Sequence, residues 1–449
     1  MKRIAILGGG TAGVAAAYFL AQSNAEADVT LYEASTRLGG IVETVREGGF
    51  IIEGGPDGWV TEKPWALELA NELGLEDEVI QSLDEDRKTY IRLDGQLVAM
   101  PDGMRMMVPG DLAAVEASTL FSDEAKQAFR DEPCQAEALR AAAPDTDESV
   151  ASFVQRHFGP EVLTRIAAPL LSGVFGGDVN TLSVRAVMPA FVAMEREYGS
   201  LIQAVQAKAK QPQRPIFTTL RSGVGTLVEA MAARIPPQWI QRNEAVKRLQ
   251  RTPECWLVDG RPFDSVLLAT PVDVAAQLLE PTDHRAYQLM QMEASSAVIV
   301  ALCFNESFDL PPGFGFLVPP GQDSLLMAST FMDQKFPHRV PPGSRLVRAF
   351  FGGAAAQRLM RCGNDETAAI ARMELARILG PLPTPAITVI RRWPNSLPQY
   401  AVGHLDRMAE LESRVDSIGN LRLLGNGYRG VGLPDLIRDA RKAATEVLD

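Results

Sequence analysis

The sequence predicts a protein of the class α/β plus α+β, in which an N-terminal βαβ unit is combined with a mixed sheet and a group of helices. Three observations support this prediction. The first part of the chain, up to Glu33, follows the order strand, glycine-rich turn, helix, strand. Residues 101–212 show helical periodicity, and residues 287–384 are rich in strand-forming segments. A chain of 449 residues is too long for one core, so two or three domains are expected.

The N-terminal motif contains the residue types of a dinucleotide-binding site in the required order. An apolar strand at 2–7 leads into Gly8-Gly9-Gly10-Thr11-Ala12-Gly13, and a helix and a second strand ending in Glu33 follow. Gly8 would permit the tight turn, Gly10 the close approach of a pyrophosphate, and Gly13 the packing of the helix on the sheet. The N–H groups at the helix start would attract phosphate, and Glu33 would bind a ribose diol. The sequence therefore predicts a Rossmann-like domain.

Two further turns extend this predicted site. The first runs from Ala34 to Gly40, where Arg37 could pair with a phosphate and Gly39-Gly40 would allow close backbone approach. Short strands at 42–45 and 50–53 then lead to the turn Gly54-Gly55-Pro56-Asp57-Gly58, and a helix is expected at 64–73. Both turns carry little side-chain bulk, which suits a backbone that contacts a ligand.

The remaining chain is expected to leave this first domain and return to it twice. A hairpin turns at Asp94-Gly95, a strand at 245–251 contains Val246, and the C-terminal strand at 421–424 enters a glycine loop and a helix from Pro434. The dipole of that helix would favour negative charge at the loop. The predicted segments are 1–87 (cofactor domain), 88–100 (hairpin of the substrate domain), 101–212 (helical domain), 213–286 (cofactor domain), 287–384 (substrate domain) and 385–449 (cofactor domain).

Composition excludes several classes of partner. A net charge of −12 argues against nucleic acid and against a basic anchor on anionic lipid. The sequence contains no run of about twenty apolar residues, so no membrane span is expected. The chain begins with a predicted strand, which leaves no room for a signal peptide. We therefore expect a cytoplasmic protein without integral membrane association. The four cysteines have no metal-site spacing, so we expect no metal site and a reduced, buried set: Cys134, Cys255, Cys303 and Cys362.

The motifs together resemble a known family. The first glycine motif, Glu33 to Gly40 and residues 53–57 look like the FAD-binding start of the flavin amine oxidase superfamily. Residues 169–183, Leu-Pro-Gln-Tyr at 397–400 with Gly403-His404, and the loop at 425–435 are similar to the porphyrinogen oxidases. The likeness is strongest to the oxygen-dependent, FAD-containing coproporphyrinogen III oxidases, and it spans nearly the whole chain.

The resemblance implies a function and a set of contacts. It implies six-electron oxidation of coproporphyrinogen III to coproporphyrin III in haem biosynthesis, with hydrogen peroxide formed from oxygen and possible transfer of product to a ferrochelatase. Noncovalent FAD would do the chemistry at its N5, and no protein acid or base is obligatory. Cations would hold the propionates of the substrate, with Lys63 foremost and Arg348, Arg391 and Arg392 as weaker candidates, while Tyr400 and His404 could bound the cleft. The expected cofactor contacts are Gly8 to Gly13, Glu33, Ala34, Arg37, Gly39, Gly40, Gly55, Pro56, Asp57, Gly58, Val246, Trp393, Gly425, Val431, Gly432 and Leu433.

Three alternatives remain open from the sequence. Protoporphyrinogen IX oxidase would have a more apolar pocket and a more membrane-seeking helical domain, whereas this helical domain is rich in acidic residues. An amine oxidase that tethers its flavin to a C-terminal cysteine is disfavoured, because the last cysteine is Cys362. A flavin-binding or porphyrin-binding protein without turnover is the third alternative, and failure of porphyrinogens to reduce the flavin would favour it.

Overall fold

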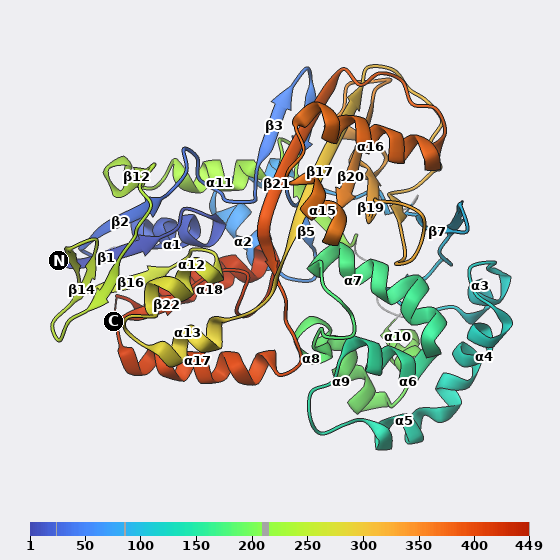
Figure 1. Ribbon diagram of the computed structural model, residues 1–449, viewed down its shortest axis with the longest axis horizontal. Coiled ribbons are helices and arrows are strands. Elements are labelled where there is room, and N and C mark those ends of the chain that lie inside the picture. The colour runs from blue at the N-terminus through green and yellow to red at the C-terminus, as the bar shows by residue number, and fades with distance from the viewer. Residues whose placement is uncertain (24, 85–86, 209–214, 449) are drawn as a thin grey trace.

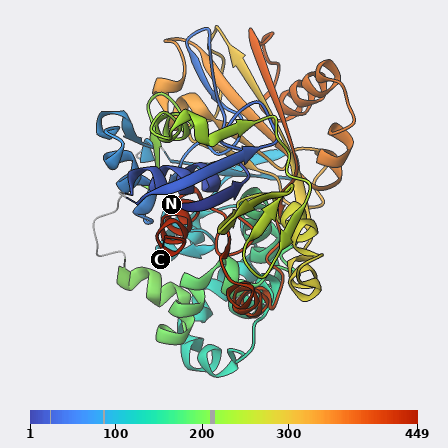
Figure 2. The same cartoon turned by 90° about the vertical axis from the view of Figure 1, so that its left-hand side faces the viewer.

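The computed structural model describes residues 1–23, 25–84, 87–208 and 215–448. The main parts of the structure are a five-stranded sheet, a seven-stranded sheet and a group of helices. Figure 1 shows the seven-stranded sheet above the helical group and the five-stranded sheet beside both, and Figure 2 shows the same order from the side. The α/β plus α+β class predicted from the sequence is confirmed.

The five-stranded sheet is entirely parallel and is built from three distant stretches of the chain. Its order is β12-β2-β1-β16-β22. The apolar run of β1 is fully buried, as expected for a strand covered on both faces. The strands are β1 (Lys2–Leu7), β2 (Ala27–Glu33), β12 (Ile240–Arg242), β16 (Ser265–Leu268) and β22 (Leu421–Leu423).

Helices cover both faces of this parallel sheet. One core joins Ile4 and Ile6 of β1 to the first group of helices, and another joins Ala5 and Leu7 to the second group. The sequence had predicted the helix at 64–73 and those after the two glycine loops, but not α17. The first group is α1 (Thr11–Gln22), α2 (Trp65–Glu72), α11 (Gly225–Ala232) and α18 (Leu433–Glu446); the second is α12 (Val272–Leu279), α13 (His284–Met290) and α17 (His404–Ile418).

Smaller antiparallel elements flank this sheet. The expected strand at 245–251 begins only at Leu249, so Val246 precedes it, and this part of the prediction is wrong. Val246 is half-buried and packs against the second core. The smaller elements are β3 (Thr44–Glu47) with β4 (Phe50–Glu53); β5 (Trp59–Val60) with β11 (Phe217–Leu220) and β6 (Val79–Gln81); and β13 (Leu249–Arg251) with β14 (Trp256–Val258) and β15 (Arg261–Phe263).

The seven-stranded sheet is mixed, in the order β21-β17-β20-β19-β18-β7-β8. Residues 387–398 were expected in the last cofactor segment, but they form β21 and pair along β17. One face packs under α15 and α16, and the other packs on Phe50 and Ile52 of β4. The elements are β7 (Thr89–Leu93), β8 (Gln96–Ala99), β17 (Ala294–Phe304), β18 (Gly315–Leu317), β19 (Ala328–Phe331), α14 (Met332–Lys335), β20 (Arg345–Phe351), α15 (Gly353–Leu359), α16 (Asn364–Leu379) and β21 (Ile387–Pro398).

The helical group has its own core of aliphatic and phenylalanine side chains. Ser122, Ser149 and Ser183 each cap a helix through the side-chain oxygen. The predicted boundary at 212/213 lies outside the described residues. The elements are β9 (Met104–Arg105), β10 (Val108–Pro109), α3 (Leu112–Ala117), α4 (Asp123–Asp131), α5 (Ala136–Ala142), α6 (Val150–Val162), α7 (Ala168–Phe175), α8 (Val184–Val187), α9 (Pro189–Tyr198) and α10 (Leu201–Lys208).

Two expectations from composition can be compared with the fold. In the part of the chain that the structure describes, no helix combines the length and the apolar character needed to cross a bilayer. All four cysteines are free, but only Cys303 is buried, and Cys134 is exposed. The expectation of a buried set is therefore wrong, because Cys134 lies on the exposed side of a short 3-10 helix, Glu132–Gln135, between α4 and α5.

Candidate functional site

The N-terminal glycine loop joins β1 to α1 at the carboxyl edge of the parallel sheet. Gly8 has a φ of 108°, and a Cβ on it would lie 2.5 Å from the carbonyl oxygen of Ala269. A Cβ on Gly13 would lie 1.9 Å from the carbonyl oxygen of Gly8. A Cβ on Gly10 would instead meet no atom within 4 Å. Gly8 and Gly13 are thus required by the protein itself, whereas the open face of Gly10 suits the approach of a ligand.

Glu33 ends β2 beside this loop. Its two carboxylate oxygens accept hydrogen bonds from the backbone N–H groups of Gly9 and Ser35, both at 2.7 Å. Because each carboxylate oxygen can accept more than one hydrogen bond, both retain capacity for a ribose diol. The neighbouring Ala34 is exposed. Glu33 therefore ties the loop to the strand and still presents an acceptor at the sheet edge.

The segment before Val246 runs beside this acid. The backbone N–H groups of Asn243 and Glu244 donate to the carbonyl oxygens of Ser35 and Glu33 at 3.0 and 2.9 Å. Val246 lies two residues beyond this contact. Its expected contact with the cofactor stays a prediction, although the strand that was to contain it begins only at Leu249.

Arg37 braces the second turn. Its guanidinium donates to the carbonyl oxygens of Leu38 and Val42 at 3.2 Å each, and also to that of Gly40. It also lies above the ring of Trp393, 5.8 Å from the ring centroid. These contacts fix the Gly39-Gly40 backbone, whose N–H at Gly39 donates to the carbonyl oxygen of Gly9 at 2.8 Å. The expected contact of Arg37 with a phosphate stays a prediction.

The turn at 54–58 is held by side chains from the seven-stranded sheet and α14. The indole N–H of Trp393 donates to the carbonyl oxygen of Gly54 at 2.7 Å, and the guanidinium of Arg348 donates to that of Gly55. The ammonium of Lys335 lies 3.0 Å from the carboxylate of Asp57. Burial would raise the pKa of Asp57, but Lys335 and Arg348 outweigh burial and hold that pKa below its ordinary value.

The three expected propionate-binding arginines are engaged elsewhere. Arg348 is only 1% exposed and holds Gly55. The guanidinium of Arg391 forms two hydrogen bonds to Glu43, at 2.6 and 2.7 Å. That of Arg392 donates to the carbonyl oxygens of Leu359 and Cys362 at 3.0 and 2.9 Å. Each guanidinium thus has a structural partner among the described residues, and the expected role of the three arginines in substrate binding stays a prediction.

The C-terminal glycine loop enters α18 much as the first loop enters α1. No side chain caps the start of either helix, and Gly432 and Gly10 occupy the two N-cap positions. The hydroxyl of Tyr400 donates to the carbonyl oxygen of Asn426 at 2.7 Å and accepts from the N–H of Gly430 at 3.0 Å. The ring Nε2 of His404 lies 3.0 Å from the carbonyl oxygen of Tyr428. This loop is therefore held in place by side chains.

Tyr400 and His404 are core residues rather than walls of a cleft. They are 2% and 0% exposed, and their rings stack with centroids 3.9 Å apart. Burial raises the pKa of Tyr400 and lowers that of His404 to about 4. Both side chains are too buried to line a cleft in this structure, which differs from the expectation for Tyr400 and His404. Lys63 differs, since its side chain is 43% exposed and its ammonium lies 2.5 Å from Asp435 at the start of α18.

Both glycine loops leave the sheet at one edge. The N–H of Ala269 donates to Leu7 and that of Leu424 donates to Leu268, so the ends of β1, β16 and β22 are aligned. Leu433 packs in the same core as Ala12. Two uncapped helix starts, an open glycine face and a carboxylate thus meet at the carboxyl edge, which is where parallel sheets bind dinucleotides. The residues present fit such a cofactor.

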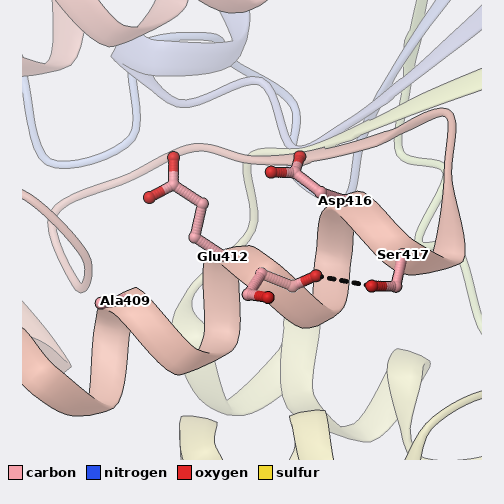
Figure 3. Close-up of a pocket in the computed structure, with 5 residues that line it drawn as sticks. Ala409, Glu412, Asp416 and Ser417 are labelled. Atoms are coloured by element: carbon pink, nitrogen blue, oxygen red, sulfur yellow. Dashed lines mark hydrogen bonds between the residues drawn. The ribbon is translucent and has the colours of Figure 1, made fainter.

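The structure also has a groove along α17, lined by Ala409, Glu412, Ser413, Asp416 and Ser417 (Figure 3). Glu412 of this groove forms an ion pair with Arg429 of the second loop. The hydroxyl of Ser417 donates to the carbonyl oxygen of Ser413 at 2.8 Å. This groove contains none of the residues predicted from the motifs, so we place the functional site at the glycine loops.

Sequence reasoning missed the charged residues behind the turn at 54–58. Lys335 contacts Asp57, while Arg339 and Glu53 form an ion pair at 2.6 Å with both side chains fully buried. Lys335 and Arg339 stand among ordinary surface-type residues in the sequence, and their partners lie 278 and 286 positions away. No local signal could have identified them.

The geometry defines a dinucleotide-binding protein, and comparison with known proteins identifies its class as flavin-dependent oxidoreductase. The family model described as flavin containing amine oxidoreductase matches residues 11–448. A coproporphyrinogen III oxidase of Bacillus subtilis (strain 168) is 30% identical, over 100% of this chain and 98% of the relative. A protoporphyrinogen oxidase of Bos taurus is 29% identical, over 100% and 98%. A crystal structure from Exiguobacterium sp. 255-15, provisionally named a protoporphyrinogen oxidase, superposes with a TM-score of 0.89 at 30% identity, over 100% and 98% of the two chains.

The chain therefore belongs to the flavin containing amine oxidoreductase family and, within it, groups with the coproporphyrinogen III and protoporphyrinogen oxidases. It is a flavin-dependent oxidoreductase.

Proposed function

We propose that this protein oxidises coproporphyrinogen III to coproporphyrin III in the cytoplasm, with noncovalently bound FAD and with oxygen as the electron acceptor. The observation that carries the proposal is the end-to-end similarity to coproporphyrinogen III oxidases, combined with two glycine loops that meet at one sheet edge. Removal of six electrons by three molecules of oxygen gives one porphyrin and three molecules of hydrogen peroxide.

Residues of this chain would bind and orient the reactants. Backbone N–H groups at Gly10 to Gly13 would hold the pyrophosphate, Glu33 the ribose, and the turn at 54–58 would lie beside the flavin ring, as in the family it resembles. The bound flavin would supply hydride acceptance at N5. A methylene bridge that loses hydride leaves a positive charge that the flanking pyrrole nitrogens stabilise, so the substrate needs positioning rather than a strong protein base.

Lys63 is the proposed ligand for a substrate propionate. It is the one expected propionate cation whose side chain is substantially exposed in the described structure, and it lies beside the C-terminal loop. Asp435 already partners its ammonium, so a propionate would add to that pair or replace it. We further propose a ferrochelatase as the recipient of the product.

Anaerobic reduction of the bound flavin by coproporphyrinogen III and by protoporphyrinogen IX, at equal concentrations, tests the proposed substrate. We expect faster bleaching of the flavin absorbance with coproporphyrinogen III. Faster bleaching with protoporphyrinogen IX would favour the activity named for the bovine relative. Bleaching by neither porphyrinogen would contradict the proposal and favour amines as substrates or a protein without turnover.

A further inference from the structure

The turn at 54–58 is held in place by side chains that lie outside the parallel sheet. Three side chains of the seven-stranded sheet and α14 hold it: Trp393 binds the carbonyl oxygen of Gly54, Arg348 that of Gly55, and Lys335 the carboxylate of Asp57. Arg348 also lies 3.5 Å from Asp57. The conformation of the turn therefore depends on charged groups that are remote in sequence.

These charged groups belong to a buried cluster whose net charge is positive. It contains three cations and two anions, with side-chain exposures between 0% and 16%. Arg339 binds Glu53, and Lys335 and Arg348 share Asp57, so one positive charge is left over. Within the described residues the Nε of Arg348 has no hydrogen-bond partner. A buried charge is poorly screened by solvent, so its field extends to groups packed against the turn.

We propose that Arg348 and Lys335 are positioning residues that hold the turn at 54–58 and place one uncompensated positive charge behind the flavin. This inference rests on the proposed function, because the family likeness puts that turn beside the flavin ring. A positive charge there stabilises the more electron-rich form of the cofactor. The cluster thus raises the midpoint potential of the bound flavin and eases hydride acceptance from the substrate.

Three substitutions separate the hydrogen bonds of Arg348 from its charge. Arg348→Met removes the hydrogen bonds and the charge, whereas Arg348→Lys keeps the charge but cannot contact both Gly55 and Asp57 as the guanidinium does. Asp57→Asn increases the net positive charge of the cluster by one. We expect the midpoint potential to fall in Arg348→Met, to stay near the wild-type value in Arg348→Lys, and to rise in Asp57→Asn. A tenfold change in the reduction equilibrium, about 30 mV for a two-electron couple, is the expected size.

A purely structural role gives a different pattern. Loss of packing would weaken FAD binding to the apoprotein in all three variants without giving potential shifts of opposite sign. The dissociation constant of FAD is therefore measured alongside the potential. Arg285→Met is the matched control, because Arg285 of α13 forms an exposed pair with Glu410 of α17. It should change neither quantity.

The outcomes also distinguish this inference from the proposed function. A wild-type protein that binds no FAD, or whose flavin no porphyrinogen reduces, contradicts the proposed function. A wild-type flavin that porphyrinogen reduces, together with equal or like-signed potential shifts in Arg348→Met and Asp57→Asn, overturns the inference. If Arg348→Met does not fold, Lys335→Met removes the second cation on Asp57 and should also lower the potential.

Discussion

The two glycine loops reach the same edge of the parallel sheet but are stabilised in different ways. At the first loop the constraint is backbone against backbone, because a Cβ on Gly13 would lie 1.9 Å from the carbonyl oxygen of Gly8. At the second loop the constraint comes from side chains, chiefly Tyr400 and His404, which hold the carbonyl oxygens of Asn426 and Tyr428. Similar local geometry therefore arises from a short sequence motif in one case and from tertiary packing in the other.

This difference determines what each loop tolerates. The first loop depends on having no side chain at Gly8 or Gly13, so a Cβ added at either position should disrupt it. The second loop depends in addition on hydrogen bonds from Tyr400 and His404, so loss of either side chain should have a graded effect, and that of His404 should vary with pH. Substitutions in the two loops should thus separate into all-or-none and graded effects on flavin affinity.

The largest effect is expected at the first loop. Gly13→Ala places a Cβ against the carbonyl oxygen of Gly8, which should reduce FAD affinity at least about a hundredfold, because α1 must move away from the sheet. Titration of the apoprotein with FAD measures this loss.

Gly10→Ala should leave the melting temperature of the apoprotein unchanged and still weaken FAD binding, since its Cβ would enter open space. Normal FAD affinity in Gly10→Ala would contradict a pyrophosphate at this position.

The second-largest effect is expected from pH at the second loop. Burial lowers the pKa of His404 to about 4, below its usual value of about 6.5. Between these values the unfolded chain binds the proton and the folded chain does not, so stability falls as the pH is lowered from 6.5 to 4, by up to about 3 kcal/mol. Melting curves across this range should show the decline. His404→Gln should flatten it, and an unchanged slope in that variant would contradict the assignment to His404.

His157 in the helical group provides a comparison of opposite sign. Burial opposes its charged form, but hydrogen bonds to Glu132 and Glu195 at 2.9 and 3.0 Å outweigh burial and raise the pKa of His157. The stability that it contributes is present below pH 6.5 and is lost as the pH rises through the raised value. His157→Gln should therefore change the alkaline side of the stability profile and leave the decline between pH 6.5 and 4 intact.

A smaller effect is expected from Tyr400→Phe. The variant leaves the carbonyl oxygen of Asn426 and the N–H of Gly430 without their partner, at a cost of about 1–3 kcal/mol in unfolding free energy, and FAD affinity should fall several-fold. Tyr428→Phe is the matched control. Its hydroxyl is buried without a hydrogen-bond partner among the described residues, so its loss should be neutral or slightly stabilising. Equal losses in both variants would show that ring packing, not hydrogen bonding, holds the loop.

The smallest effect is expected from Lys63→Ala. The Lys63 side chain is 43% exposed, and its buried partner Asp435 keeps a second cation, Arg438, at 3.3 Å, so the loss of Lys63 should cost about 0–1 kcal/mol in stability. The melting temperature should hardly change, whereas KM for coproporphyrinogen III should rise several-fold with kcat retained. Lys442→Ala removes a comparably exposed lysine on the same helix as Asp435 and serves as the control. An unchanged KM in Lys63→Ala would remove Lys63 from the substrate site.

The comparison of the loops also explains how far the sequence could predict the molecule. The first loop was predictable because strand, glycines, helix and acid lie within 33 consecutive residues and each constraint is local. The strand β21 was missed because Pro394 lacks an N–H, which argues against a strand when the pairing partner is unknown, and the structure adds a φ of 47° at Asn395. The sheet tolerates them at its edge, where β21 pairs with β17 alone.

The roles of single charged side chains were least predictable. Arg348, Arg391 and Arg392 all looked like candidates for propionate binding, and only the three-dimensional structure shows their partners at Gly55, Glu43 and Leu359. Tyr400 and His404 belong to a recognisable motif, but their motif positions do not reveal that they face the back of the loop. A charged residue finds its partner through tertiary structure, so sequence alone identifies it as a candidate and not as a ligand.

The most direct test of the account is a crystal structure of the protein with FAD bound. We expect the pyrophosphate at the open face of Gly10, the ribose at Glu33, and the flavin ring between the turn at 54–58 and the start of α18, with Tyr400 and His404 still behind the second loop. A dinucleotide bound away from either loop, or a second loop that makes no contact with it, would contradict the claim that two differently stabilised loops form one site.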